Sequence, residues 1–161
     1  MSHEPVTSFL KGLAMGRNRF LYGLHVTPDD RLTWSPGGNA YTPLQLAGRL
    51  EGFLGFIGHL VKTGAMPETR GELPVPPASR EEAKARLGAA FDRLRAAALE
   101  LSEADLARMV PTPWGEPIPA RAMLTGANQV VSYFQGQLNY LQLIYGDTNA
   151  NIPPNWGREE G

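Results

Sequence analysis

Apolar side chains recur at steps of three and four residues over four long stretches of this chain, the spacing of one face of an α-helix. The first stretch runs from about 5 to 25, and the second starts at 43 and keeps its apolar face to 61. The third covers about 22 residues after 79, and the last runs from about 119 to 146. Since each helix has one apolar face to bury, we expect an all-α fold: a four-helix bundle with an up-down-down-up arrangement.

Capping residues, prolines and glycines predict where these helices begin and end. Thr42 with Gln45, and Ser79 with Glu82, have the spacing of capping boxes, and Gly146 suits the C-terminal cap of the last helix. Proline and glycine fill 27–41, 64–78 and 111–119, so we expect long loops there, with one helical turn after position 28 and a short helix after position 102. The glycines of the second stretch could allow close helix packing: Gly52, Gly55 and Gly58.

Length and composition limit what such a bundle can do. A chain of 161 residues with 42% apolar residues is most simply one domain, placed at 1–147, with a tail at 148–161 that is either flexible or pinned by Trp156. The absence of cysteine excludes disulfides, thiolate metal sites and a cysteine nucleophile. A formal charge of −1 and the lack of a long apolar run predict no nucleic-acid or membrane partner. Without a signal-peptide pattern, we expect a cytoplasmic protein.

Three segments, in this order, resemble the DinB/YfiT-like family of four-helix proteins. The segment 25–50, HVTPDDRLTWSPGGNAYTPLQLAGRL, has the family's short Thr-Pro-Asp turn, a Trp-x-Pro and then a capped helix. The segment 112–124, TPWGEPIPARAML, is similar to the family's lead into its last helix. The segment 130–147, VVSYFQGQLNYLQLIYGD, is similar to the family's ending of His-x-x-x-His-x-Gly-Gln followed by leucines and a glycine.

The resemblance implies a metal site that this sequence does not complete. Members of the family hold a divalent metal with three histidines, one early on the second long helix and two a turn apart on the last. Some resemble thiol-dependent transferases. Aligned on the Gly-Gln pair at 136–137, those positions are Arg49, or Gly48 if the alignment shifts by one, together with Val130 and Phe134. None of these side chains ligates a metal, so we expect no metal and no cofactor.

The histidines that the chain does contain do not have the spacing of such a site. They are His3, His25 and His59, and no two of them are three or four residues apart. We expect His3 in a loose terminus and His25 at the end of the first helix, where a cation is favoured by the helix dipole. His59 is expected on the polar surface.

The residues at the family's ligand positions have several possible roles. Val130 and Phe134 lie in the apolar stripe of the last stretch, where they either fill the core or line an apolar pocket with Arg49, Phe53 and Gln137. Arg49 lies inside the apolar stripe of the second stretch, and a buried charge without a partner is strongly unfavourable. Its side chain can reach solvent over Phe53, pair with a carboxylate of the third stretch, or bind a small anion. These alternatives stay open.

The last stretch is rich in uncharged polar side chains. By resemblance, Gly136 and Gln137 are structural: the glycine allows close packing, and the glutamine bonds a neighbouring loop. Uncharged polar surfaces with tyrosine are also typical of subunit interfaces. Since members of the family are often homodimers, we expect a homodimer here.

These observations predict a DinB-like protein that has lost its metal site. We expect a protein without catalytic activity that binds a small anionic or apolar molecule, or another protein, with a stress-related role as one option. Two alternatives stay open. One is a metal-dependent thiol transferase or hydrolase with other ligands, and the other is a purely structural homodimer.

Overall fold

The four stretches form four long helices that pack into one bundle. The computed structural model describes residues 4–68 and 74–156. Its long helices are α1 (Glu4–Val26), α2 (Pro43–Thr63), α3 (Arg80–Leu99) and α5 (Ala120–Ile144). Between them lie η1 (Asp29–Arg31), α4 (Glu103–Ala107), β1 (Met109–Thr112) and β2 (Gly115–Pro119). The predicted four-helix fold is confirmed, with a small two-stranded sheet added to it.

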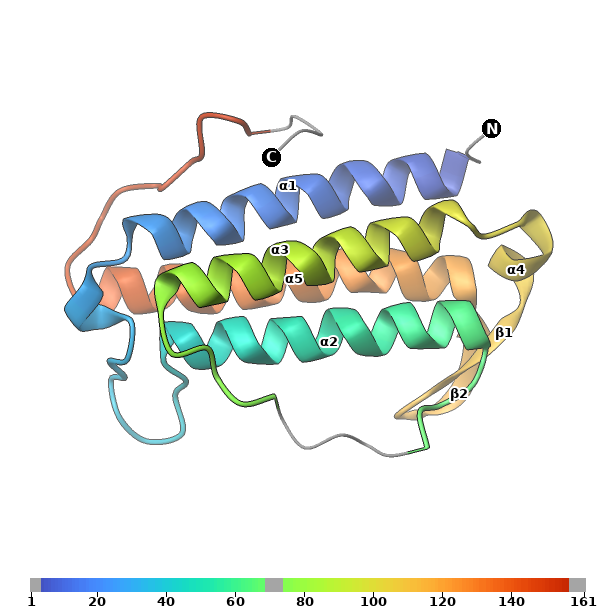
Figure 1. Cartoon of the computed structure of the whole chain (residues 1–161), viewed down its shortest axis with the longest axis horizontal. Coiled ribbons are helices and arrows are strands. Elements are labelled where there is room, and N and C mark those ends of the chain that lie inside the picture. The colour runs from blue at the N-terminus through green and yellow to red at the C-terminus, as the bar shows by residue number, and fades with distance from the viewer. Residues whose placement is uncertain (1–3, 69–73, 157–161) are drawn as a thin grey trace.

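Helices that run in the same direction are neighbours in this bundle. α1 and α5 run one way and α2 and α3 run the other, which is the up-down-down-up arrangement (Figure 1). α1 packs against α3 and α5, and α2 packs against the same two helices. Because α2 and α3 are parallel neighbours, the chain must return along the length of the bundle between them. This explains the long connection at 64–79.

The core is built from the helix faces that the apolar spacing predicted. Its largest fully buried side chains come from all four long helices and include Phe20, Leu24, Leu50, Ile57, Leu60, Leu87, Phe91, Leu94 and Leu124. Ile144, at the last position of α5, is 42% exposed. It follows the buried Leu138 by six residues, which turns it about 120° around the helix. Among the described residues, no helix combines the length and the apolarity that crossing a membrane requires.

The predicted helix starts are confirmed, with one difference at α3. The Thr42 hydroxyl accepts from the backbone N–H of Gln45 at 3.2 Å, and the Gln45 side chain accepts from the N–H of Thr42 at 2.9 Å. At α3, the Ser79 hydroxyl accepts from the N–H of Glu82, but the Glu82 carboxylate accepts from the N–H of Ala78 instead of that of Ser79. This bond lowers the pKa of Glu82, and so the carboxylate stays charged at the positive end of the helix.

α5 ends at a left-handed glycine, as predicted. Tyr145 is its C-cap, and Gly146 follows with φ of 99°. The N–H groups of Gly146 and Asp147 donate to the carbonyls of Leu143 and Gln142, at 3.1 and 2.9 Å. These two bonds satisfy carbonyls that would otherwise be free at the end of the helix.

Two arginines from distant segments close the C-terminal ends of α1 and α2, and the sequence alone did not reveal this. Arg80 donates to the carbonyls of Leu24, at 3.0 Å, and Thr27. Arg108 donates to the carbonyl of Val61 at 2.6 Å. A helix C-terminus has free carbonyls and a partial negative charge, so a guanidinium there both donates hydrogen bonds and offsets the charge.

Glycines on α1 allow this helix to lie very close to α5. The three positions are Gly12, Gly16 and Gly23. A β-carbon added at each would lie 2.3, 2.5 and 2.8 Å from side-chain atoms of Asn128, Val131 and Leu138, respectively. The glycines of α2, which could have allowed close helix packing, do not bring another helix as near. A β-carbon at Gly52 would lie 2.7 Å from Pro74, which is in a loop. At Gly55 no described atom lies within 4 Å, and at Gly58 the nearest is an atom of Leu94 at 3.9 Å.

The segment 111–119, expected to be a loop, belongs to a β-hairpin. β1 and β2 pair antiparallel, with Met109 opposite Pro119 and Val110 opposite Ile118. Gly115 lies at the turn with φ of 124°. Proline is unusual inside strands, and the prolines at 111, 117 and 119 therefore hid the strands in the sequence.

We predict opposite effects of alanine at two helical glycines. Gly16→Ala is expected to lower the free energy of unfolding by about 1–3 kcal/mol, because its β-carbon overlaps Val131. Gly55→Ala is expected to raise it by about 0.5–1 kcal/mol, because alanine favours helix and the space is open. Urea unfolding followed by circular dichroism measures both. A Gly16→Ala variant as stable as the wild type would contradict the close approach of α1 and α5.

Candidate functional site

The three positions that the family resemblance singles out lie on two helices that pack against each other. Arg49 is on α2, and Val130 and Phe134 are on α5. Phe134 is only 8% exposed and meets the Tyr133 ring edge to face, with 6.0 Å between the ring centroids. Val130 is half-buried and packs against the core. Both side chains therefore contribute to the hydrophobic packing of α5.

Arg49 is half-buried and lies against the ring of Tyr41, in the loop before α2. Its guanidinium carbon is 4.2 Å from the ring centroid, a favourable cation–π distance. Its Nε is buried without a hydrogen-bond partner among the described residues. The ion pair between α2 and α3 is formed by Glu51 and Arg86, at 2.6 Å. Pairing of Arg49 with a carboxylate of α3 is thus not found in the described chain, and the solvent and anion alternatives remain.

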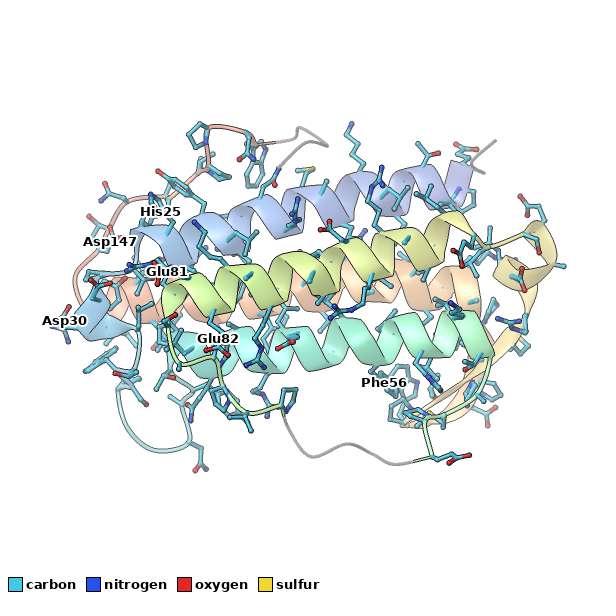
Figure 2. All side chains as sticks on the ribbon, in the orientation of Figure 1. His25, Asp30, Phe56, Glu81, Glu82 and Asp147 are labelled. Atoms are coloured by element: carbon cyan, nitrogen blue, oxygen red, sulfur yellow. The ribbon has the colours of Figure 1, made fainter. Side chains whose placement is uncertain are left out.

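The side chains at these three positions do not fit a bound metal. Valine and phenylalanine have no donor atom, and a guanidinium stays protonated and repels cations. Within 4–68 and 74–156, no three His, Cys, Asp or Glu side chains are grouped so that they could hold an ion. His25, at the end of α1 (Figure 2), and His59 are both exposed, while His3 lies outside the described residues.

The glutamine that ties α5 to other segments is Gln142, where Gln137 was expected. Gln142 is 2% exposed, and its Nε2 donates to the Gly23 carbonyl at 3.0 Å and to the Thr27 hydroxyl at 3.3 Å. Its Oε1 accepts from the Asn151 side chain. Gln142 thereby joins α5, the end of α1 and the tail. Gln137 is half-buried, and no bond from it to a loop is found in the part of the chain described.

The described part of the tail, 148–156, is held against the bundle. It leaves α5 at Asp147, at one end of the bundle, and runs back beside α1 (Figures 1 and 2). The Asp147 carboxylate accepts from the Asn151 side chain at 2.8 Å, and this bond is the main reason why the pKa of Asp147 is lowered. Farther on, the Asn155 carbonyl accepts from Asn18. These contacts place residues 148–156 against α1 and the end of α5.

A groove of about 330 Å³ runs between α1 and α5, and sequence reasoning missed it. Its lining includes Gly12, Gly16 and Arg19 of α1, Gln135 and Gly136 of α5, and Trp156 of the tail. Gly136 is exposed, and a β-carbon there would meet no atom of the described residues within 4 Å. The close packing expected at Gly136 is therefore not found. In the sequence, the only indication of this groove was the pair Gly12 and Gly16, which are four residues apart on α1.

The groove is distinct from the pocket that the sequence analysis expected. That pocket would be lined by Arg49, Phe53, Val130, Phe134 and Gln137, and none of these lines the groove. Phe53 is half-buried on α2 and packs against the core. A pocket between α2 and α5 remains a prediction.

Comparison with known proteins establishes the fold. No family model matches the chain, and a search of curated proteins finds no match. Among solved structures, the chain is similar to a DinB-like protein, YjoA, from Bacillus subtilis, with a TM-score of 0.69 and 16% identity over 91% of this chain and 95% of that one. It is also similar to the mycothiol-dependent maleylpyruvate isomerase, with a TM-score of 0.60 and 20% identity over 83% of this chain and 60% of the isomerase.

At these identities the likeness shows the fold alone, and that fold is DinB-like. The fold implied by the three segments of the sequence is thereby confirmed. The chain spans 60% of the length of the isomerase, so the activity of that protein does not transfer with the fold.

We predict that Gln142, and not Gln137, stabilises the end of the bundle. Gln142→Leu is expected to lower the free energy of unfolding by about 1–3 kcal/mol, because it removes buried hydrogen bonds to α1 and the tail. Gln137→Leu is the matched control and is expected to change it by less than about 0.5 kcal/mol. Chemical denaturation of both variants gives the comparison. Equal losses would mean that Gln137 has the structural role after all.

Proposed function

We propose that this chain is a protein without metal chemistry or catalytic activity that binds a small anionic or apolar molecule and works as a homodimer. The observation that supports this best is the side-chain chemistry at Arg49, Val130 and Phe134, where a fixed cation and two hydrocarbon groups occur. A guanidinium attracts anions and repels metal ions. The hydrocarbon side chains of Val130 and Phe134 have no donor atom and cannot ligate a metal. The fold is compatible with this, because one fold carries many functions. A cytoplasmic location and a stress-related role remain predictions.

The main alternative is a metal-dependent thiol transferase or hydrolase with other ligands. One solved neighbour is, by its name, a mycothiol-dependent isomerase, and the other is named only as DinB-like. Such an enzyme needs a metal with an open coordination position, and its ligands would have to come from other side chains than those at the three positions. The third reading, a purely structural homodimer, predicts that no small molecule binds.

We expect that histidines at the three positions create a metal site that the wild type lacks. The wild type, purified without an affinity tag, should contain no stoichiometric zinc, nickel or manganese by elemental analysis. The combined variant Arg49→His, Val130→His and Phe134→His should bind one zinc ion in calorimetric titration, since three imidazoles from α2 and α5 supply the donors. The variant with histidine only at 130 and 134 is the control and should bind more weakly.

Two results would contradict this prediction. A full equivalent of metal in the wild type would favour the enzyme. A triple variant that folds but binds no divalent ion would show that the three positions are misaligned.

The outer face of α5 is the surface that we propose for the homodimer. Of its 25 residues, only Arg121 is charged. Large apolar side chains are exposed along its second half: Tyr133 (67%), Tyr140 (65%), Leu143 (55%) and Ile144 (42%). Interface cores favour tyrosine and exclude charge. α5 is about 37 Å long, so this face offers an extended surface with little charge.

A charge placed on this face is expected to separate the copies. Tyr140→Arg should convert a dimer into a monomer in size-exclusion chromatography with light scattering, because two like charges would be buried in a symmetric contact. Leu99→Arg, at an apolar residue of α3 that is 47% exposed, is the control and should stay dimeric. A wild type with the mass of a monomer would remove the homodimer from the proposal and leave the binding function to be tested separately.

A further inference from the structure

The groove between α1 and α5 has glycines on its floor, beside the side chains of Asn128, Ser132 and Gln135. Gly12 and Gly16 of α1 face α5 so closely that no β-carbon fits, and Gly136 of α5 leaves its own side of the groove bare. Met15 and Trp156 supply apolar walls. A narrow groove with backbone on its floor and apolar walls accepts a flat, partly apolar molecule.

Two amides at this groove, one of a buried and one of a half-buried residue, have a buried oxygen atom that bonds to nothing in the described chain. Gln135 is 5% exposed; its Nε2 donates to the Asn139 side chain at 2.7 Å, and its Oε1 has no partner. The Asn128 Nδ2 donates to the Phe9 carbonyl at 3.0 Å, and its Oδ1 has no partner. In each case the NH₂ group is already used, so the amide is fixed with its oxygen free. Buried acceptors without partners are unfavourable, and hydrogen-bond donors of a ligand would satisfy them.

The groove is also cationic. Arg19 is the single charged residue among the described residues that line it. Its guanidinium carbon is 5.0 Å from the centroid of the Trp156 ring, and its Nε is buried without a partner in the described chain. A guanidinium that lies over a ring and forms no ion pair with a described carboxylate is arranged to receive an anionic oxygen.

These features lie in order along the groove. Asn128 packs over Gly12 at one end, and Gln135 lies close to Gly23 toward the other. The two amides are seven residues apart on α5, or about 10 Å along the helix. A ligand with an acid group for Arg19 and a hydrogen-bond donor elsewhere therefore has two candidate acceptors along the groove.

We propose that the α1–α5 groove binds a small aromatic carboxylate that carries a ring hydroxyl or amino group. The carboxylate pairs with Arg19, the ring lies on the glycine floor beside Trp156, and the hydroxyl or amino group donates to a free amide oxygen. This inference rests on the proposed function, since it assigns a place and a chemical class to the small molecule. The site is separate from Arg49, for which binding of a small anion is one of the open alternatives.

The structure offers a pair of variants that test the groove without disturbing the core. Gly136→Leu fills the groove from its open side, and Gly126→Leu, also on α5, lies outside it. A β-carbon at either position meets no described atom within 4 Å, so both variants should fold. Arg19→Gln removes the positive charge of the groove. Arg49→Ala removes the positive charge of the other candidate ligand site, between α2 and α5.

The experiment is calorimetric titration of the full chain with 4-hydroxybenzoate, benzoate and the uncharged 4-hydroxybenzamide. We expect 4-hydroxybenzoate to bind most tightly. Benzoate should bind more weakly because it has no hydrogen-bond donor, and 4-hydroxybenzamide should bind more weakly because it has no negative charge. Gly136→Leu and Arg19→Gln are expected to weaken 4-hydroxybenzoate binding by at least about tenfold, and Gly126→Leu to leave it within about twofold. Arg49→Ala is the variant that would lose binding if the ligand lay between α2 and α5 instead. Light scattering checks that the mass of each variant is unchanged.

Three outcomes would overturn the inference. If Gly136→Leu binds as well as the wild type, the groove is not the site. If only Arg49→Ala loses binding, the ligand lies between α2 and α5; the proposed function then stands and the inference fails. If no probe binds the wild type, the ligand class is wrong, whereas the proposed function itself fails only when the metal analysis finds a full equivalent of metal or a wider screen finds no ligand.

Discussion

Glycines on α1 bring this helix against α5 at a distance that any side chain would prevent. Dispersion forces fall off steeply with distance, so this close approach strengthens the contact along its whole length. It also places the end of α1 where Gln142 can donate to the Gly23 carbonyl and the Thr27 hydroxyl. On the outer side, the same missing side chains leave the groove. One constraint therefore gives both the close contact of α1 with α5 and the groove beside it.

Local signals in the sequence were sufficient for the helices and their ends. The spacing of apolar residues, the N-cap residues and Gly146 are signals that involve only residues a few positions apart. The helices begin and end where these signals predicted. Interactions between distant segments were not readable in the same way. Arg80 looked like an ordinary first residue of a helix, but it closes the end of α1, 53 and 56 residues away in sequence. The hairpin was missed because its prolines outweighed its short apolar pattern.

The candidate site, too, was predictable from the sequence only in part. That Arg49, Val130 and Phe134 cannot hold a metal follows from residue chemistry alone. Which glutamine is buried, and what the glycines of each helix face, depends on how the helices turn toward one another. Each residue is rotated by about 100° around the helix axis relative to the one before it. Gln137 therefore faces another side of α5 than Gln135 and Gln142, and it is half-buried where they are buried. The groove arises from two helices together, so neither segment shows it when read by itself.

The pairing of α1 with α5 has a consequence for the order of assembly. Phe9 and Asn128, and Gly23 and Gln142, are bonded across 119 residues of intervening chain. Loops of this length close slowly, and helical proteins that rely on such contacts fold more slowly than those built from adjacent hairpins. During synthesis, the side of α1 that packs against α5 is therefore covered only after almost the whole bundle has been made, whereas its contact with α3 can form earlier.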